Sequence, residues 1–170
     1  LYNGNLGRLT DITYTRGTTT LATYQYVTND VGQRTRATET INNVTRVADY
    51  EYDNLGRLIK ETVTVDGGNP HVIEYTYDLM GNRLSMDDSL TGLTDYLYDD
   101  DGRLESYTLG DTTTSFTYDN TGATLTEAVA IGGAPATVSK TYQYDARGML
   151  EQADVDGVAG FELLYTYDAN

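Results

Sequence analysis

The sequence predicts an all-β protein built as a continuous strip of antiparallel β-hairpins. The first observation is composition: the 170 residues include 16 Tyr and 17 Gly but only 2 Pro and no Trp. Tyr and the abundant Thr favour strands, and Gly favours turns and bulges. The second observation is periodicity, because short alternating runs such as "ETVTV" are common and no window sustains a helical period.

The third observation is a repeated phrase. "YEYDNLGRL" begins at Tyr50, and altered copies begin at Tyr75, Tyr96, Phe116 and Tyr142. Successive copies, aligned on the last tyrosine before the turn, lie 20 to 26 residues apart, and 14 of the 16 Tyr fall in motif positions. A period in the twenties indicates stacked supersecondary structures. Its irregularity indicates hairpins with a constant inner turn and outer loops of varying length. The aligned tyrosines are Tyr2, Tyr26, Tyr52, Tyr77, Tyr98, Tyr118, Tyr144 and Tyr167.

The inner turn follows from residue preferences. Asp53 suits the first position of a type I turn and Gly56 the fourth, where a positive φ gives a G1 bulge and a three-residue connection. We therefore expect Tyr52 opposite Leu58. The same Tyr-to-Gly spacing of four recurs at Tyr77/Gly81, Tyr98/Gly102, Tyr118/Gly122 and Tyr144/Gly148.

Two repeats depart from this spacing. Tyr2 to Gly7 is five residues and Tyr26 to Gly32 is six, so we expect longer loops there. Gly-rich, variable stretches are expected to form the outer loops on the opposite edge of the sheet. These stretches are residues 65–71, 90–92, 109–111, 131–136 and 154–160.

The residues after the turn glycine alternate. Arg8, Arg57 and Arg103 follow the glycine directly, whereas Arg34 and Arg83 come one position later; from Gly122 onward the pattern decays, with Ala123 and Met149 in place of the polar residue. A double-length repeat is therefore expected. We expect each arginine to contact a turn aspartate or to stack on a neighbouring tyrosine, which is a structural use of charge.

The paired tyrosines admit two interpretations. Tyr50 and Tyr52 share one face of their strand, so successive hairpins stack tyrosines into ladders. Identical aromatic residues at identical phase favour strand-to-strand packing, which would make the ladder the core. A solvent-facing platform of the same rings would instead suit carbohydrate binding.

At this point the motifs carry a family resemblance. Y-x-Y-D-x-x-G-R-L and Y-x-Y-D-x-x-G-N-R resemble the YD repeats of bacterial Rhs proteins, insecticidal toxin-complex shells and animal teneurins. The resemblance covers essentially the whole chain and implies a β-strip that forms part of a spiralling β-sheet shell. In the Rhs and toxin-complex proteins such a shell encloses a C-terminal toxin domain. Neither the self-cleaving Rhs core nor a toxin domain is present in this sequence, so no catalytic residue carries over.

Charge and composition exclude several functions. The net charge of −15 argues against nucleic acid and against anionic membrane surfaces. The chain has no Cys, and no apolar run approaches the ~18 residues of a membrane span, so we expect no membrane insertion.

Candidate chemistry is sparse. His71 is the only histidine, and nothing in the sequence joins it to a serine and an acid. Carboxylates cluster at residues 86–88, 98–102 and 154–157, but an aspartate that recurs in repeat after repeat is poorly suited to be a unique acid or base. The residues that best suit calcium are Asp99, Asp101, Asp154 and Asp156, which do not complete an EF-hand spacing. Asn43-Val44-Thr45 is a lone glycosylation sequon.

These observations predict a non-enzymatic structural segment of a large secreted or bacterial cell-surface protein. Residues 1–170 are expected to form one YD-repeat segment of about seven repeats with no second domain, cut from a longer chain. No catalytic, cofactor-binding or metal-binding residue is assigned. The expected partners are flanking YD repeats, an enclosed C-terminal toxin domain, further copies through open sheet edges, and glycans. The alternative is an extracellular adhesion, fibre or carbohydrate-binding protein.

Overall fold

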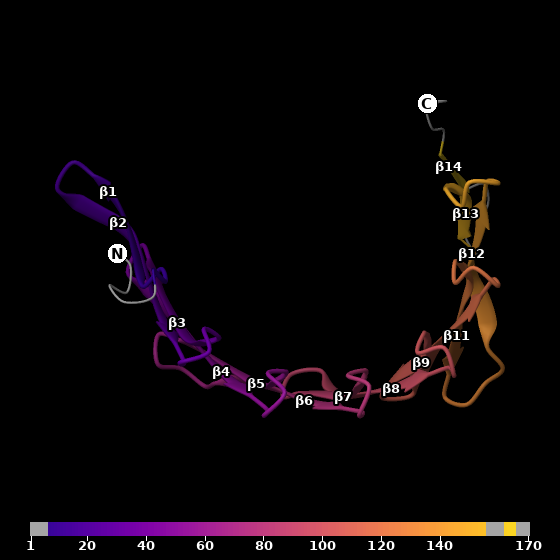
Figure 1. Cartoon of the computed structure of the whole chain (residues 1–170), viewed down its shortest axis with the longest axis horizontal. Coiled ribbons are helices and arrows are strands. Elements are labelled where there is room, and N and C mark those ends of the chain that lie inside the picture. Colours follow the sequence, from indigo (N-terminus) through magenta and orange to yellow (C-terminus); the bar gives the residue numbers. More distant parts are fainter. Residues whose placement is uncertain (1–6, 156–161, 166–170) are drawn as a thin grey trace. The chain divides into compact units, whose positions relative to one another are not determined.

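The computed structural model describes residues 7–155 and 162–165, and every regular element in this part is a β-strand. Hydrogen-bonded neighbours follow the order of the chain from β1 to β6 and from β8 to β14 (Figure 1). The all-β prediction is confirmed. The strands are β1 (Asp11–Arg16), β2 (Thr19–Thr28), β3 (Arg34–Ile41), β4 (Val44–Tyr52), β5 (Leu58–Val65), β6 (His71–Tyr77), β7 (Arg83–Asp88), β8 (Gly92–Tyr98), β9 (Leu104–Leu109), β10 (Thr112–Tyr118), β11 (Thr124–Ile131), β12 (Thr137–Tyr144), β13 (Leu150–Val155) and β14 (Glu162–Leu164).

The chain divides into two compact units. Unit 1 comprises Leu1–Thr76 and Met86–Gly92, and unit 2 comprises Tyr77–Ser85 and Leu93–Asn170. In unit 1, β1 to β6 pair successively in antiparallel fashion. In unit 2, β8 to β14 do the same. Each unit is therefore a succession of hairpins, as the repeat predicts.

The inner turns have the predicted geometry. The Gly56 N–H donates to the Asp53 carbonyl at 2.9 Å, and the Asp53 N–H donates to the Arg57 carbonyl at 2.9 Å. Gly56 has a φ of 83°, which only glycine adopts without strain. The three-residue connection is confirmed. The same two backbone bonds close all six described inner turns, at residues 29–33, 53–57, 78–82, 99–103, 119–123 and 145–149.

The expectation of a longer loop after Tyr26 is wrong. β2 continues two residues past Tyr26 to Thr28, and the turn then starts at Asn29 with the usual bonds, Gly32 N to Asn29 O at 3.0 Å and Asn29 N to Gln33 O at 2.9 Å. Asparagine fills the place of the turn aspartate because its Oδ1 accepts the Gln33 N–H at 2.9 Å. The extra residues lengthen the strand, not the loop. The loop between Tyr2 and Gly7 lies largely outside the described residues.

A second bulge follows the turn and was not predicted. Tyr52 pairs with Leu58 as expected, but the next residue back, Glu51, pairs with Lys60, so Ile59 has no opposite residue. This shift places Glu61, not Lys60, opposite Tyr50. The same bulge occurs in five described hairpins. The residues without an opposite partner are Thr35, Ile59, Glu105, Leu125 and Glu151. A bulge that recurs at the same place in each of these hairpins is a regular feature of the fold, and it increases the local twist of the strands.

The tyrosine face is packed but thin. The ring-bearing side chains of the described Tyr-x-Tyr motifs are half-buried, whereas the intervening residues, such as Leu97 at 62% exposure, face solvent on the other side. The fully covered positions hold small residues, for example Ala48 at 0% exposure opposite Ala37. Among the described residues, no large side chain is fully buried. The ladder therefore combines both interpretations: its rings pack against neighbouring strands, and one side of the face stays accessible.

The last tyrosine of a motif fastens its hairpin to the previous one. Its hydroxyl donates to the carbonyl of the residue two positions after the preceding turn glycine. Burial raises the pKa of Tyr52, Tyr118 and Tyr144, which keeps these hydroxyls protonated as donors. The four described bonds join Tyr52 to Arg34 (2.8 Å), Tyr98 to Arg83 (3.0 Å), Tyr118 to Leu104 (2.7 Å) and Tyr144 to Thr124 (2.9 Å).

Replacing Tyr118→Phe removes one such bond without changing the ring. We expect the free energy of unfolding to fall by about 0.5–1.5 kcal/mol, the usual net value of a hydrogen bond, measured by urea denaturation. Tyr142→Phe is the matched control, because Phe116 already occupies the same motif position in its own strand. Equal effects of the two substitutions would contradict the fastening role.

Candidate functional site at the inner turns

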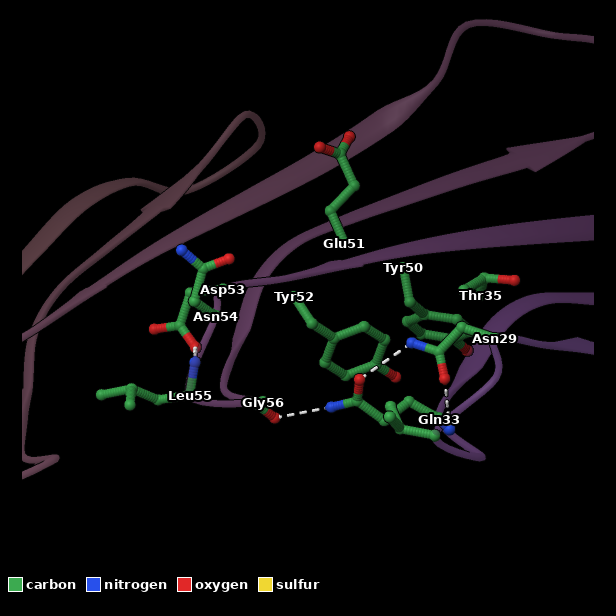
Figure 2. Close-up of a pocket in the computed structure, with 11 residues that line it drawn as sticks. Asn29, Gln33, Thr35, Tyr50, Glu51, Tyr52, Asp53, Asn54, Leu55 and Gly56 are labelled. Carbon is green, nitrogen blue, oxygen red and sulfur yellow. Dashed lines mark hydrogen bonds between the residues drawn. The ribbon is translucent and has the colours of Figure 1, made fainter.

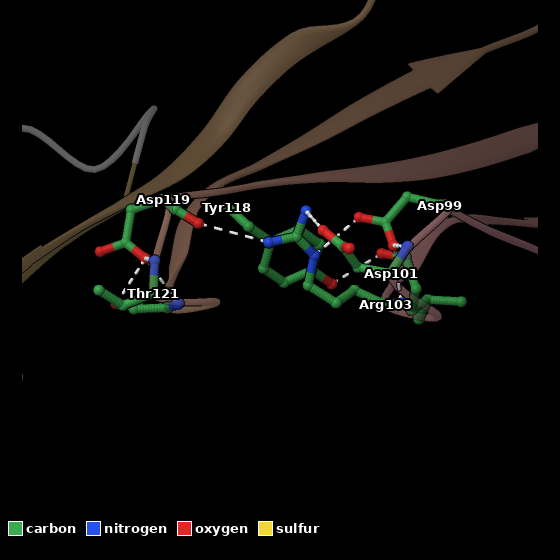
Figure 3. A network of polar contacts seen from close by, with 8 residues as sticks. Asp99, Asp101, Arg103, Tyr118, Asp119 and Thr121 are labelled. Carbon is green, nitrogen blue, oxygen red and sulfur yellow. Dashed lines mark hydrogen bonds and ion pairs between the residues drawn. The ribbon is translucent and has the colours of Figure 1, made fainter.

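An aspartate is the hub of five of the six described inner turns, all but the one that starts at Asn29. The Asp53 Oδ1 atom accepts the backbone N–H groups of Leu55 and Arg57, both at 2.9 Å, and Oδ2 accepts Arg57 Nε at 2.6 Å. Asp99 repeats this pattern with Asp101 N at 3.1 Å, Arg103 N at 2.8 Å and Arg103 Nε at 2.7 Å (Figure 3). One carboxylate therefore satisfies two turn amides and orients one guanidinium group.

These bonds stabilise the charged carboxylate. The backbone N–H of Arg57 is the main cause that lowers the pKa of Asp53, and that of Arg103 does the same for Asp99. The pKa of Asp119 is lowered chiefly by the Thr121 hydroxyl, and that of Asp145 by the Met149 N–H. At Asp78, burial acts to raise the pKa, but the hydrogen bonds led by Asn82 outweigh it and the pKa is lowered.

The alternation after the glycine now has a physical explanation. Where arginine follows the glycine directly, it pairs with the turn aspartate, as Arg57 and Arg103 do. Where Gln33 or Asn82 takes that place, its side chain bonds to the turn residue instead. The following arginines then lie over tyrosine rings, Arg34 at 4.1 Å from the Tyr26 centroid and Arg83 at 4.3 Å from that of Tyr96. Both predicted uses of arginine are confirmed.

The same side chains also brace one turn against the next. Gln33 Nε2 donates to the Gly56 carbonyl at 2.9 Å (Figure 2). Arg8 Nη1 donates to the Asn29 carbonyl at 2.7 Å, and Arg103 Nη1 to the Asp119 carbonyl at 3.3 Å. A Cβ atom on Gly56 would lie 3.1 Å from Gln33 Nε2, so glycine also provides the room for the brace. These braces were not predicted from the sequence, although the long polar residues after Gly7, Gly32 and Gly102 were their signal.

A groove of about 690 Å³ lies between the turns at 29–33 and 53–57. The rings of Tyr50 and Tyr52 and the amide of Gln33 line it, whereas the Glu51 carboxylate points away from these rings (Figure 2). Two exposed apolar side chains stand at its rim, Val31 at 78% and Leu55 at 75% exposure. Such a lining can stack and donate hydrogen bonds, but its described residues bring no nucleophile together with a base.

The single histidine of the chain does not line this groove. His71 Nε2 lies 2.8 Å from Asp88 Oδ1, and Asp88 has a lowered pKa because it accepts the Leu90 N–H and this histidine. The neighbouring Ser89 Oγ accepts the Val72 N–H at 3.0 Å. The pair therefore joins the outer ends of β6 and β7.

The calcium candidates are engaged by nitrogen donors. Asp99 and Asp101 both pair with Arg103. Both oxygens of Asp154 accept from Gln152 Nε2, and one of them also accepts the Thr141 hydroxyl at 3.4 Å. Asp156 lies outside the described residues. In the part of the chain that the structure describes, no three His, Cys, Asp or Glu side chains gather in a metal-binding arrangement.

The sequon lies at an outer tip. Asn42 and Asn43 have φ values of 51° and 66° and form the two-residue connection between β3 and β4. The Thr45 hydroxyl is hydrogen-bonded to that of Thr40 at 3.0 Å.

The outer loops predicted at 65–71, 90–92, 109–111 and 131–136 all join consecutive strands. The outer turns at residues 42–43 and at Gly17 were not predicted. The loop at 154–160 lies mostly outside the described residues.

Substitution of the hub aspartate tests its role. Asp99→Ala removes two amide acceptors and an ion pair, so we expect a clear fall in the urea midpoint. Asp99→Asn should lose less, because Asn29 closes its own turn with an amide side chain. Asp100→Ala removes an equal charge from the same turn and is the control. A midpoint for Asp99→Ala that matches the control would contradict the hub role.

Acid should weaken the turns. A carboxylate whose pKa is lower in the folded state contributes stability above its unfolded pKa, and this is lost as pH falls through the folded pKa. The shifts at Asp53, Asp78, Asp99, Asp119 and Asp145 all have this sign. We expect the urea midpoint to drop below about pH 4, the unfolded value for Asp. A midpoint that keeps rising there, as relief of the net charge of −15 alone would give, would contradict this.

Two solved structures and one family model are similar to this chain. The described part of the chain contains no helix with the length and apolar character needed to cross a membrane. Among solved structures, the chain resembles one from the Photorhabdus luminescens Tc holotoxin pore, with 13% identity over 88% of this chain and 12% of that one, at a TM-score of 0.43. A TcdB2-TccC3 structure without its hypervariable C-terminal region gives 13% identity over 88% of this chain and 10% of that one, at 0.48.

The chain thus spans about a tenth of the length of these solved chains. A comparison with curated protein sequences found no match. The family model of the teneurin YD-shell matches residues 2–170, almost the entire sequence. The recurrent turn, the tyrosine ladder and this match lead to one conclusion: the chain belongs to the teneurin YD-shell family.

Proposed function

We propose that the chain is a structural segment of a large secreted or cell-surface bacterial protein, in which it forms part of a hollow β-shell. The observation that carries this proposal is the repetition of one fastening scheme. Each hairpin closes with the same turn, and four described tyrosine hydroxyls join a hairpin to its predecessor. A function that resides in a repeated contact is mechanical, so no residue is assigned a catalytic, metal-binding or cofactor-binding role.

The natural partners in this proposal are more copies of the same hairpin. β1 pairs only with β2, and β14 only with β13, among the described strands. Exposed edges of this kind recruit further strands. Flanking YD repeats would cover them in the longer protein, with residues 1–170 acting as one segment of about seven repeats. The enclosed partner would be a C-terminal toxin domain, kept away from solvent and from the producing cell.

A second function is favoured by the accessible side of the tyrosine face. Rings of Tyr96, Tyr107 and Phe116 follow one another with centroids 6.3 and 6.1 Å apart, which is an arrangement on which sugars can stack. The alternative is therefore an extracellular adhesion or fibre protein with a carbohydrate-binding surface. A glycan array with the purified chain separates this alternative from a purely structural role.

The edges provide the test of the structural proposal. In sedimentation velocity, we expect the isolated 170-residue chain to self-associate in a concentration-dependent way through its open edges. A monodisperse monomer with cooperative unfolding would contradict the proposal.

In the full-length protein, the C-terminal domain should resist protease until the turns are weakened by combined Asp53→Ala, Asp99→Ala and Asp145→Ala substitutions. Digestion of this domain at the same rate in the unsubstituted and the substituted protein would contradict enclosure.

A further inference from the structure

One hairpin of unit 1 departs from the repeat at the place where tyrosine usually stands before the turn. Because β2 continues two residues past Tyr26, Thr28 is the last residue before the turn. It pairs with Arg34 in the same way as Tyr52 pairs with Leu58 in its own hairpin. By the rule that the other hairpins follow, a tyrosine at 28 would reach the Leu9 carbonyl, two positions after Gly7. A hollow of about 290 Å³ lies in this place. Its lining residues are Arg8, Leu9, Tyr26, Thr28, Gly32 and Arg34.

The hollow carries two cations and no lining acid, in a chain of net charge −15. Arg57 and Arg103 each pair with an aspartate four residues earlier, but Gly4 stands four residues before Arg8. Arg8 donates instead to the carbonyls of Asn29 at 2.7 Å and Asp30 at 3.1 Å. Among the described residues, neither Arg8 nor Arg34 forms an ion pair.

The two guanidinium groups are also held in place. Arg34 is exposed and lies over the Tyr26 ring at 4.1 Å, which fixes its plane but leaves its N–H edge available. A Cβ on Gly32 would lie 3.0 Å from Arg8 Nη2, so the glycine permits the position of Arg8. A planar guanidinium fork matches a carboxylate, which binds two parallel N–H groups.

We propose that this hollow binds a carboxylate-bearing sugar ring, such as a uronic acid residue of an acidic glycan. The volume suits one ring and is too small for a larger ligand. The Tyr26 ring and the Leu9 side chain provide apolar surface for the sugar face, Thr28 provides a hydroxyl, and Arg34 with Arg8 bind the carboxylate. The site is independent of the proposed structural role, because it uses a hairpin in which the tyrosine fastening is absent.

The test measures binding of trigalacturonate to the full 170-residue chain by calorimetry, with methyl-esterified trigalacturonate as the matched neutral probe. We expect the acid form to bind at least about tenfold more tightly than the ester, because charged hydrogen bonds are lost with the charge. Arg34→Gln should weaken binding by a similar factor. Arg83→Gln is the matched control, since Arg83 also stacks on a tyrosine but belongs to the hairpin of β6 and β7, in which Tyr77 keeps the usual place before the turn.

Thr28→Tyr is the decisive variant, because it restores the residue usual in the repeat and fills the hollow. We expect it to abolish binding while its circular dichroism spectrum and urea midpoint are kept or improved, which separates binding from folding. Equal binding of acid and ester, unchanged binding by Arg34→Gln, or full binding by Thr28→Tyr would each overturn the proposal. Competition by inorganic phosphate at the same concentration as the sugar would show a simple anion site and overturn the sugar assignment, as would selective binding of an aspartate-rich peptide.

Discussion

The interaction on which the rest of this structure depends is the acceptance of two backbone N–H groups by the carboxylate of the turn aspartate. A three-residue connection leaves amides that no strand can satisfy, and Asp53 Oδ1 satisfies two of them at once. Because the turn is closed in this way, the strand that leaves it starts in a fixed register, with Leu58 opposite Tyr52. The second bulge then fixes which side chains of that strand join the tyrosine face. Register, face and ladder thus all follow from one local contact.

This constraint also explains how a chain with so little buried volume holds its shape. Small residues such as Ala48 fill the covered positions, so area burial alone gives each hairpin modest stability. The contacts between hairpins are instead directional: a tyrosine hydroxyl to a carbonyl, and an arginine or glutamine to the next turn. Directional hydrogen bonds fix the distance and register between successive hairpins, whereas a hydrophobic layer requires only that the hairpins be in contact. In a nearest-neighbour array, such a scheme makes each repeat depend chiefly on the one before it.

Much of this could be predicted from the sequence, since the informative residues are close together in the chain. The Asp–Gly spacing specified the turn, and the tyrosine alternation specified the face. The wrong prediction of the loop after Tyr26 arose because more than one residue nearby could mark the start of the turn. Tyr26 was taken as the end of its strand because tyrosine marks that place elsewhere, yet Asn29 set the turn and Thr28 became the last strand residue. The braces from Arg8 and Gln33 cross more than 20 residues, and only the spatial neighbourhood of two turns reveals them. The hollow beside Arg34 was missed for the same reason.

The two edges of each hairpin differ in what they tolerate. The inner edge repeats one closed geometry, whereas the outer connections that the structure describes range from two residues between Ile41 and Val44 to five between Val65 and His71. Loop closure becomes only slightly less favourable as a loop lengthens, so the outer edge accepts insertions at small thermodynamic cost. The outer loops are consequently sites at which other groups can be attached one hairpin at a time. Fluorophores, affinity tags or whole grafted peptides placed at outer tips would be displayed at intervals of one hairpin, while the inner edge keeps the register unchanged.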